Sequence, residues 1–171
     1  MRARWHRRAV LAAAAIVVSA CAGPRAELAH GTFRAPERFR VAVPTAEWTV
    51  ARATDSELEL RHAASGAGIL ANADCGAATA RQDLPALARR LFFGLQARES
   101  LANGAVTLAG LPAVHTVVEA RVSGEEERMR VEAYVTKDER CVYDLVYVAP
   151  IAAFAERRRD FQRLVDSFVT E

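Results

Sequence analysis

The sequence is poor in lysine, cysteine and aromatic residues. Among 171 residues it has one lysine (Lys137), three cysteines and 7% aromatic side chains, while 51% of the residues are hydrophobic. Length and composition together indicate a single globular domain rather than a disordered or fibrous protein. The sequence also lacks a glycine-rich phosphate loop, a G-x-S-x-G motif and an H-E-x-x-H motif, so no cofactor and no catalysis are expected.

The hydrophobic run near the N-terminus is too short to cross a bilayer as a helix. The hydrophobic run from Ala9 to Ala20 covers 12 residues, about 18 Å as a helix, whereas a crossing takes about 20 residues. A basic start, a short apolar run and small residues at its end are typical of a secretory signal peptide, which we therefore expect over residues 1–20. The basic start consists of Arg2, Arg4, Arg7 and Arg8.

Without that segment the net charge of the chain changes from positive to negative. From Ala22 onward 19 basic residues face 21 acidic ones, because four of the 23 basic residues precede it. A nucleic-acid-binding surface needs a clustered excess of positive charge, so no nucleic acid partner is expected.

The end of the hydrophobic run is more specific. Residues 18–21, Val-Ser-Ala-Cys, resemble the lipobox of bacterial lipoproteins. The resemblance implies cleavage before Cys21, lipid attachment to its sulfur and acylation of the new N-terminus, and several acyl chains together give stable anchoring. Ala22 follows where the usual retention signal is Asp, so the expected location is the outer membrane, facing the periplasm.

The remaining chain divides into a tether and a domain. Residues 21–32 show no periodicity and contain Gly23, Pro24 and Gly31, so we expect the lipidated cysteine and a flexible linker there. Residues 33–171 are expected to form one domain, long enough to bury a single core.

The hydrophobic pattern of this domain predicts strands, a helix, more strands and a final helix. Alternation predicts strands over residues 39–43, 48–50, 57–61, 69–75, 106–122 with a break near Gly110 and Pro112, 128–136 and 141–148. Asp83 is expected to cap an amphipathic helix with Pro85 in its first turn, and Asn103-Gly104 to stop the segment after it. A second amphipathic helix is expected from Pro150 onward. This order indicates an α+β fold with a largely antiparallel sheet of about six strands and two helices packed on it.

Several short motifs in this layout resemble the Mog1/PsbP-like family. They are the F-x-V-x-V-P strand at residues 39–44 followed by Trp48, the Gly-Leu-Pro-Ala at 110–113, the strand at 143–149 and the helix end at 166–168. The resemblance implies a Mog1/PsbP-like α/β sandwich that binds a partner. It brings no shared catalytic residue, and a fold says little about function by itself.

Two cysteines remain if Cys21 is lipidated. Cys75 and Cys141 lie on or beside predicted strands, and an oxidising envelope favours a disulfide between them. The alternative is two free thiols, because disulfide geometry is strict. A zinc site from these cysteines with His62 and His115 is conceivable by residue type, but no pair has ligand spacing, so surface histidines are expected.

Three further features are possible partner sites by residue type. Tyr143 and Tyr147 share a strand face with Cys141, and this face is a candidate binding surface unless a helix covers it, in which case it belongs to the core. The acidic run 125–127 with Asp138-Glu139, and the arginines 157–159, are expected to be solvated surfaces rather than partner or lipid sites.

The sequence therefore predicts a lipid-anchored envelope protein whose domain binds another protein. One alternative is a carrier of a small molecule or lipid that uses a cleft between helix and sheet. A second, less favoured alternative is a thiol- or metal-dependent envelope enzyme.

Overall fold

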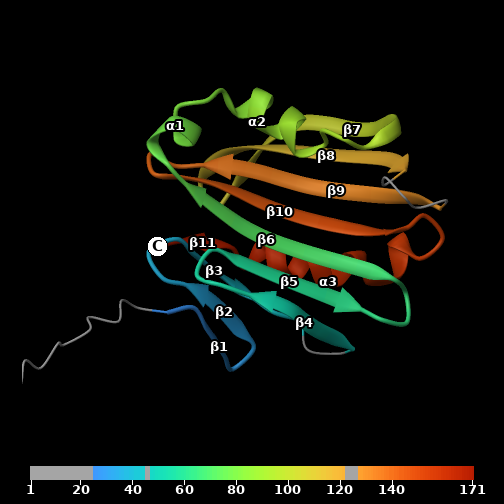
Figure 1. The fold of residues 1–171 in the computed structure, drawn as a ribbon, viewed down its shortest axis with the longest axis horizontal. Helices are drawn as coiled ribbons and strands as arrows, with labels where there is room; N and C mark the ends of the chain where they lie inside the picture. The colour runs from blue at the N-terminus through green and yellow to red at the C-terminus, as the bar shows by residue number, and fades with distance from the viewer. Residues whose placement is uncertain (1–24, 45–46, 122–126) are drawn as a thin grey trace, which may run out of the picture.

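The computed structural model describes residues 25–44, 47–121 and 127–171 (Figure 1). The predicted signal peptide and Cys21 lie outside these residues. The helices are α1 (Ala77–Ala80), α2 (Leu84–Leu91) and α3 (Phe154–Asp166). The strands are β1 (Glu27–Ala29), β2 (Thr32–Ala35), β3 (Phe39–Ala42), β4 (Trp48–Ala53), β5 (Glu57–His62), β6 (Ala67–Cys75), β7 (Gln96–Leu108), β8 (Leu111–Arg121), β9 (Arg128–Lys137), β10 (Cys141–Pro150) and β11 (Val169–Thr170).

The strands form two antiparallel sheets. A seven-stranded sheet has the order β4-β5-β6-β10-β9-β8-β7, and a four-stranded sheet has the order β1-β2-β3-β11. The two sheets and three helices make an α+β fold, as the sequence predicts. Among the described residues, no helix has the length and hydrophobicity needed to span a membrane.

The inner face of the large sheet holds the main core. Strand alternation puts Ile69 of β6 and Leu145 of β10 on this face, where both are fully buried. Helix α3 and the four-stranded sheet cover it, and α3 runs behind the large sheet in Figure 1. Phe161 of α3 stacks on Tyr147 with ring centroids 5.6 Å apart. These contacts anchor α3 to the sheet.

The outer face of the same sheet is covered at one end only. Helix α2 begins at Asp83, whose carboxylate accepts a hydrogen bond from the backbone N–H of Ala86, as the capping pattern predicts. Its buried Leu87 packs with Val135 and Val142 of β9 and β10. Within the described residues, no helix lies over β4 and β5 on this side, so this part of the face stays open.

The structure corrects the prediction in the N-terminal segment. The expected linker includes β1 and the first residue of β2, which pair as a hairpin in which Ala29 lies opposite Thr32. The turn between them is made by His30 and Gly31, both with positive φ. Gly31, on which the linker prediction partly rests, therefore serves a tight turn.

The prediction around residues 103–122 was also wrong. Asn103-Gly104 does not stop the segment but lies within β7, opposite His115 and Thr116 of β8. The expected break near Gly110 is a two-residue hairpin turn formed by Ala109 and Gly110 at positive φ. One broken strand is thus two paired strands, which raises the large sheet to seven.

Helix α3 begins later than expected. Pro150 is the last residue of β10, opposite Met129, and its carbonyl accepts a hydrogen bond from the N–H of Ala153 in the following turn. The helix starts at Phe154, so Ile151 precedes it.

Candidate functional site

The two cysteines of the domain are joined by a disulfide. Cys75 and Cys141 face each other in register at the end of the β6–β10 pair, with Cα atoms 4.0 Å apart. Neither sulfur is therefore available as a nucleophile or thiolate ligand while the bond is intact. This pairing agrees with the favoured prediction for these residues.

The strand face that carries the two tyrosines is not a surface in the structure. Tyr143 and Tyr147 are both fully buried. The Tyr143 hydroxyl donates to Asp138 Oδ2 at 2.8 Å, and the Tyr147 hydroxyl donates to the carbonyl of Phe154 at 2.9 Å. Burial raises the pKa of Tyr147 to about 12. The face is core because α3 and the small sheet cover it.

The two histidines have separate structural partners. His62 on β5 is buried and lies 2.8 Å from the Ser65 hydroxyl through Nδ1. His115 on β8 lies 2.9 Å from Glu132 Oε1 through Nε2. No group of three or more His, Cys, Asp or Glu side chains suited to a metal occurs in the described part of the chain.

Glu132 is a fully buried carboxylate on the inner face of the sheet. Burial opposes its ionisation most strongly, but hydrogen bonds from Arg158 and His115 outweigh burial and hold the pKa of Glu132 below its usual value. The Arg158 guanidinium donates at 2.6 and 2.7 Å. Arg158, which the sequence suggested was merely solvated, thus ties α3 to β9.

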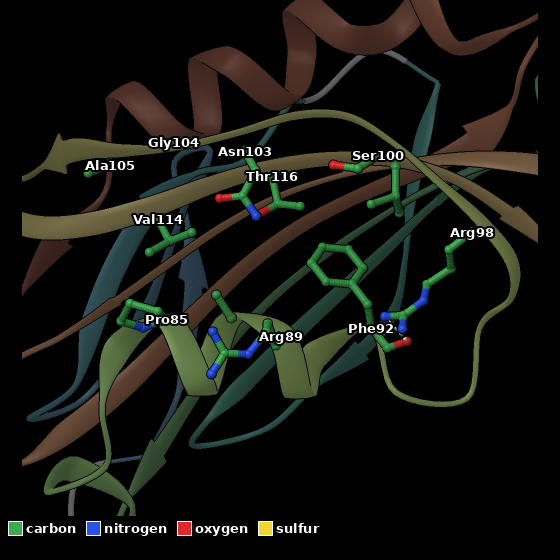
Figure 2. Close-up of a pocket in the computed structure, with 12 residues that line it drawn as sticks. Pro85, Arg89, Phe92, Arg98, Ser100, Asn103, Gly104, Ala105, Val114 and Thr116 are labelled. Atoms are coloured by element: carbon green, nitrogen blue, oxygen red, sulfur yellow. Dashed lines mark hydrogen bonds between the residues drawn. The ribbon is translucent and has the colours of Figure 1, made fainter.

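A cleft opens on the outer face between α2 and the β7–β8 hairpin (Figure 2). Its volume is about 510 Å³. The cleft is lined by Pro85, Ala88, Arg89 and Phe92 from the α2 side, Arg98, Ser100, Asn103, Gly104 and Ala105 from β7, and Val114, Thr116 and Val118 from β8. These described lining residues include two arginines and no acidic side chain, so the cleft favours an anionic or hydrogen-bond-accepting group.

Local chain geometry builds this cleft. Helix α2 ends at Leu91 with Phe92 as its C-cap residue, and Gly94 at a φ of 91° turns the chain into β7. The Arg98 guanidinium donates to the Phe92 carbonyl at 3.2 Å, which holds the first part of β7 against the helix end. Figure 2 shows the Phe92 ring between Arg89 and Arg98, with Asn103 and Thr116 across the cleft.

A second hollow lies on the uncovered part of the outer face. This groove, of about 680 Å³, has Leu70, Met129, Val146 and Val148 along it. Glu59 and Arg61 at its rim are paired at 2.8 Å. An apolar floor with a neutralised rim is suited to contact with another protein.

Asp144 lies at a third, smaller pocket beneath α1 and α2, beside Asp74. Burial raises its pKa to about 6, and the neighbouring charge of Asp74 adds to the effect, while a hydrogen bond from Asn72 opposes it. Across the pocket lies Arg90 of α2. The site has the character of a buried structural carboxylate rather than of a ligand site.

The sequence alone did not predict that these residues line a cleft. Arg89, Arg98 and Asn103 line one cleft because α2 packs on β8 and β9 beside β7, and the sequence did not predict β7 and β8 as two paired strands. One signal was present: no charged residue occurs from Ser100 to Val118, which is unusual for a strand at the edge of a sheet.

No family model and no curated protein matches the sequence. Solved structures do match its fold. Cyanobacterial PsbP (CyanoP) from Synechocystis aligns with a TM-score of 0.53 and 10% identity over 79% of this chain and 88% of its own. The domain has a PsbP-like fold.

Two further structures support this fold. A protein of unknown function from Pseudomonas aeruginosa aligns with a TM-score of 0.55 and 12% identity, covering 77% of this chain and 91% of that one. A protein from Bacteroides thetaiotaomicron aligns with a TM-score of 0.54 and 8% identity over 78% of this chain. This chain covers only 45% of that protein. None of the three is described as an enzyme, and at such low identity the likeness concerns the fold alone.

Proposed function

We propose that this chain is a lipid-anchored protein of the bacterial envelope whose PsbP-like domain binds another protein. The observation that carries the proposal is a set of exposed large apolar side chains on the segment that runs from the end of α2 through β7. Phe93 is 89% exposed, Leu101 46% and Val106 37%. Exposed apolar groups gathered at one place are typical of interaction surfaces, and a large aromatic side chain is the commonest anchor of such contacts.

The proposed anchor suits this placement. Only five residues lie between Cys21 and Glu27, the first residue of β1, so the tether reaches about 20 Å at most. Strands β1 and β7 lie at opposite ends of the molecule (Figure 1). A domain held to the membrane through β1 would present the cleft and its apolar side chains to the periplasm.

Site-specific photo-crosslinking in intact cells tests the proposal. A photoreactive amino acid replaces Phe93 in one strain and Val169, which is 40% exposed on β11, in a control strain. We expect one discrete crosslinked protein from position 93 and none from position 169. Products from position 93 that are spread over abundant envelope proteins would contradict the proposal.

A second candidate function, a carrier of a small molecule, is favoured by the cleft alone. Its volume of about 510 Å³ falls within the range of ligand pockets, and it combines an aromatic ring with arginines. Native mass spectrometry of protein isolated from cells tests this candidate. A retained anionic ligand, lost when Arg89 is replaced by Glu, would support it, and a ligand-free mass would contradict it.

A further inference from the structure

Strand β7 is an edge of the seven-stranded sheet, and half of it lacks the features that normally protect such an edge. Among the described residues β8 is its one partner in the sheet order, so the other side of β7 has no paired strand there. Unprotected edges offer backbone N–H and C=O groups to any chain that can add a strand. Natural proteins prevent this with charges, bulges, prolines or covering segments.

The first half of β7 has such protection. Register shifts interrupt its pairing with β8 between Gln96 and Glu99 and between Ser100 and Ala102. Arg98 and Glu99 add charge in the same stretch. The opposite edge, β4, is protected in the same way, by a register shift between Val50 and Arg52 and by the charge of Arg52.

The second half of β7 has none of these features. Residues 102–108, Ala-Asn-Gly-Ala-Val-Thr-Leu, pair with β8 in unbroken register from Ala102 opposite Val117 to Leu108 opposite Leu111. They carry no charge and no proline, and all but Leu108 are exposed. This stretch is therefore a free edge of about seven residues.

The free edge borders the cleft. Asn103, Gly104 and Ala105 line the cleft and also lie on this edge. A strand that paired with β7 would place alternate side chains on the outer face, next to the cleft. The arginines there would meet an acidic side chain.

From these observations we infer that residues 102–108 of β7 accept an extended, acidic segment of another protein as an additional strand, with a carboxylate of that segment directed to Arg89 and Arg98. The inference rests on the proposed function and names its binding mode. Backbone pairing supplies affinity in such complexes, and side-chain pockets supply selectivity.

A second copy of this chain fits the site less well. Pairing of two β7 edges would bring only the uncharged sequence 102–108 to the cleft, with no acidic group for the arginines. Charge complementarity therefore favours a different, acidic segment.

The test uses purified full-length protein in detergent and a phage library of random nine-residue peptides. We expect enriched peptides to contain Asp or Glu together with β-branched or aromatic residues. A synthetic copy of the best peptide should bind about tenfold more weakly to Val106→Lys, which adds charge to the edge, and to Arg89→Glu, which reverses charge in the cleft.

The matched control is Val50→Lys on the opposite edge, at a residue of similar exposure (44% against 37% for Val106). It should leave peptide binding unchanged. A peptide whose acidic residue is replaced by Lys should regain binding to the Arg89→Glu variant, which a merely unfolded variant cannot do.

Four results would overturn the inference. They are failure to enrich any peptide, enrichment without acidic residues, binding that Val106→Lys leaves intact, and a dimer of this chain that Val106→Lys dissolves. If any one of these occurs while position 93 still crosslinks to one discrete protein in cells, the proposed function stands and only the β7 binding mode falls. Failure of both experiments removes both.

Discussion

Asp144 illustrates how one buried residue sets a pH dependence. Burial raises its pKa in the folded protein to about 6, whereas an unfolded Asp titrates near pH 3.9. As pH rises from about 4 to 6, the unfolded chain loses this proton while the folded chain keeps it. The folded state is therefore favoured by this group below pH 4 and loses that advantage as pH rises through 6.

The variant Asp144→Asn should not lose stability through this group as the pH rises. At pH 7 we expect its free energy of unfolding to exceed that of the parent by about 1–3 kcal/mol, with the difference vanishing near pH 4. Urea denaturation from pH 4 to 8 measures it. Glu139→Gln, on an exposed turn, serves as the control and should follow the parent. A difference that is equal at both ends of the pH range would contradict this interpretation.

At the scale of elements, the Glu132–Arg158 contact fixes α3 to the sheet. Glu132 is fully buried, while the Arg158 side chain is 49% exposed. Loss of the arginine would leave a buried carboxylate with His115 as its remaining hydrogen-bond partner among the described residues. We expect Arg158→Met to lower the free energy of unfolding at pH 7 by about 2 kcal/mol, less than for a fully buried pair because water screens the exposed guanidinium.

The pH dependence of this effect follows from the lowered pKa of Glu132. Its stabilisation is present above the unfolded pKa near 4.3 and is lost as pH falls through the folded value. The cost of Arg158→Met should therefore shrink at acidic pH. Arg159→Met, at the next and exposed position of α3, is the matched control and should have little effect. Equal costs for the two variants would contradict a stabilising role of the Glu132–Arg158 contact.

The elements themselves were largely predictable because local physics defines them. The capping carboxylate of Asp83 and the alternation along β5 and β6 operate within a few residues, and both appear as expected. The β7–β8 hairpin was misread because Asn103-Gly104, a common turn dipeptide, is held extended by its pairing with β8. Tertiary context outweighs local preference there.

The candidate site was less predictable than the fold. The cleft joins a helix and two strands whose register no local pattern specifies, so Arg89 and Arg98 gave no signal in sequence. The sequence left open whether the face of Tyr143 and Tyr147 is exposed, for a related reason. Alternation places Tyr143 and Tyr147 together, but only the packing of α3 and the small sheet decides whether that face is covered.

At the scale of the whole molecule, the disulfide closes a large loop. Cys75 and Cys141 are separated by 66 residues, and cross-linking a loop of that size stabilises the folded state by about 4 kcal/mol in the chain-entropy model. The double variant Cys75→Ala/Cys141→Ala should unfold at lower urea, with a free energy of unfolding reduced by about 2–4 kcal/mol. Reduction of the parent should reproduce this loss, and reduction of the double variant should change nothing further. An unchanged urea midpoint in the reduced parent would contradict a stabilising role of the disulfide.

The functional proposals for this chain rest on its proposed envelope location. An oxidising compartment accounts for the disulfide, and the proposed anchor directs β7 and the cleft away from the membrane. The most direct measurement is the intact mass of the protein extracted from membranes, alkylated once without reduction and once after it. We predict a chain that begins at Cys21 and carries acyl chains, with two thiols alkylated only after reduction. A chain that retains residues 1–20 and carries no lipid, or thiols that alkylate without reduction, would contradict the account.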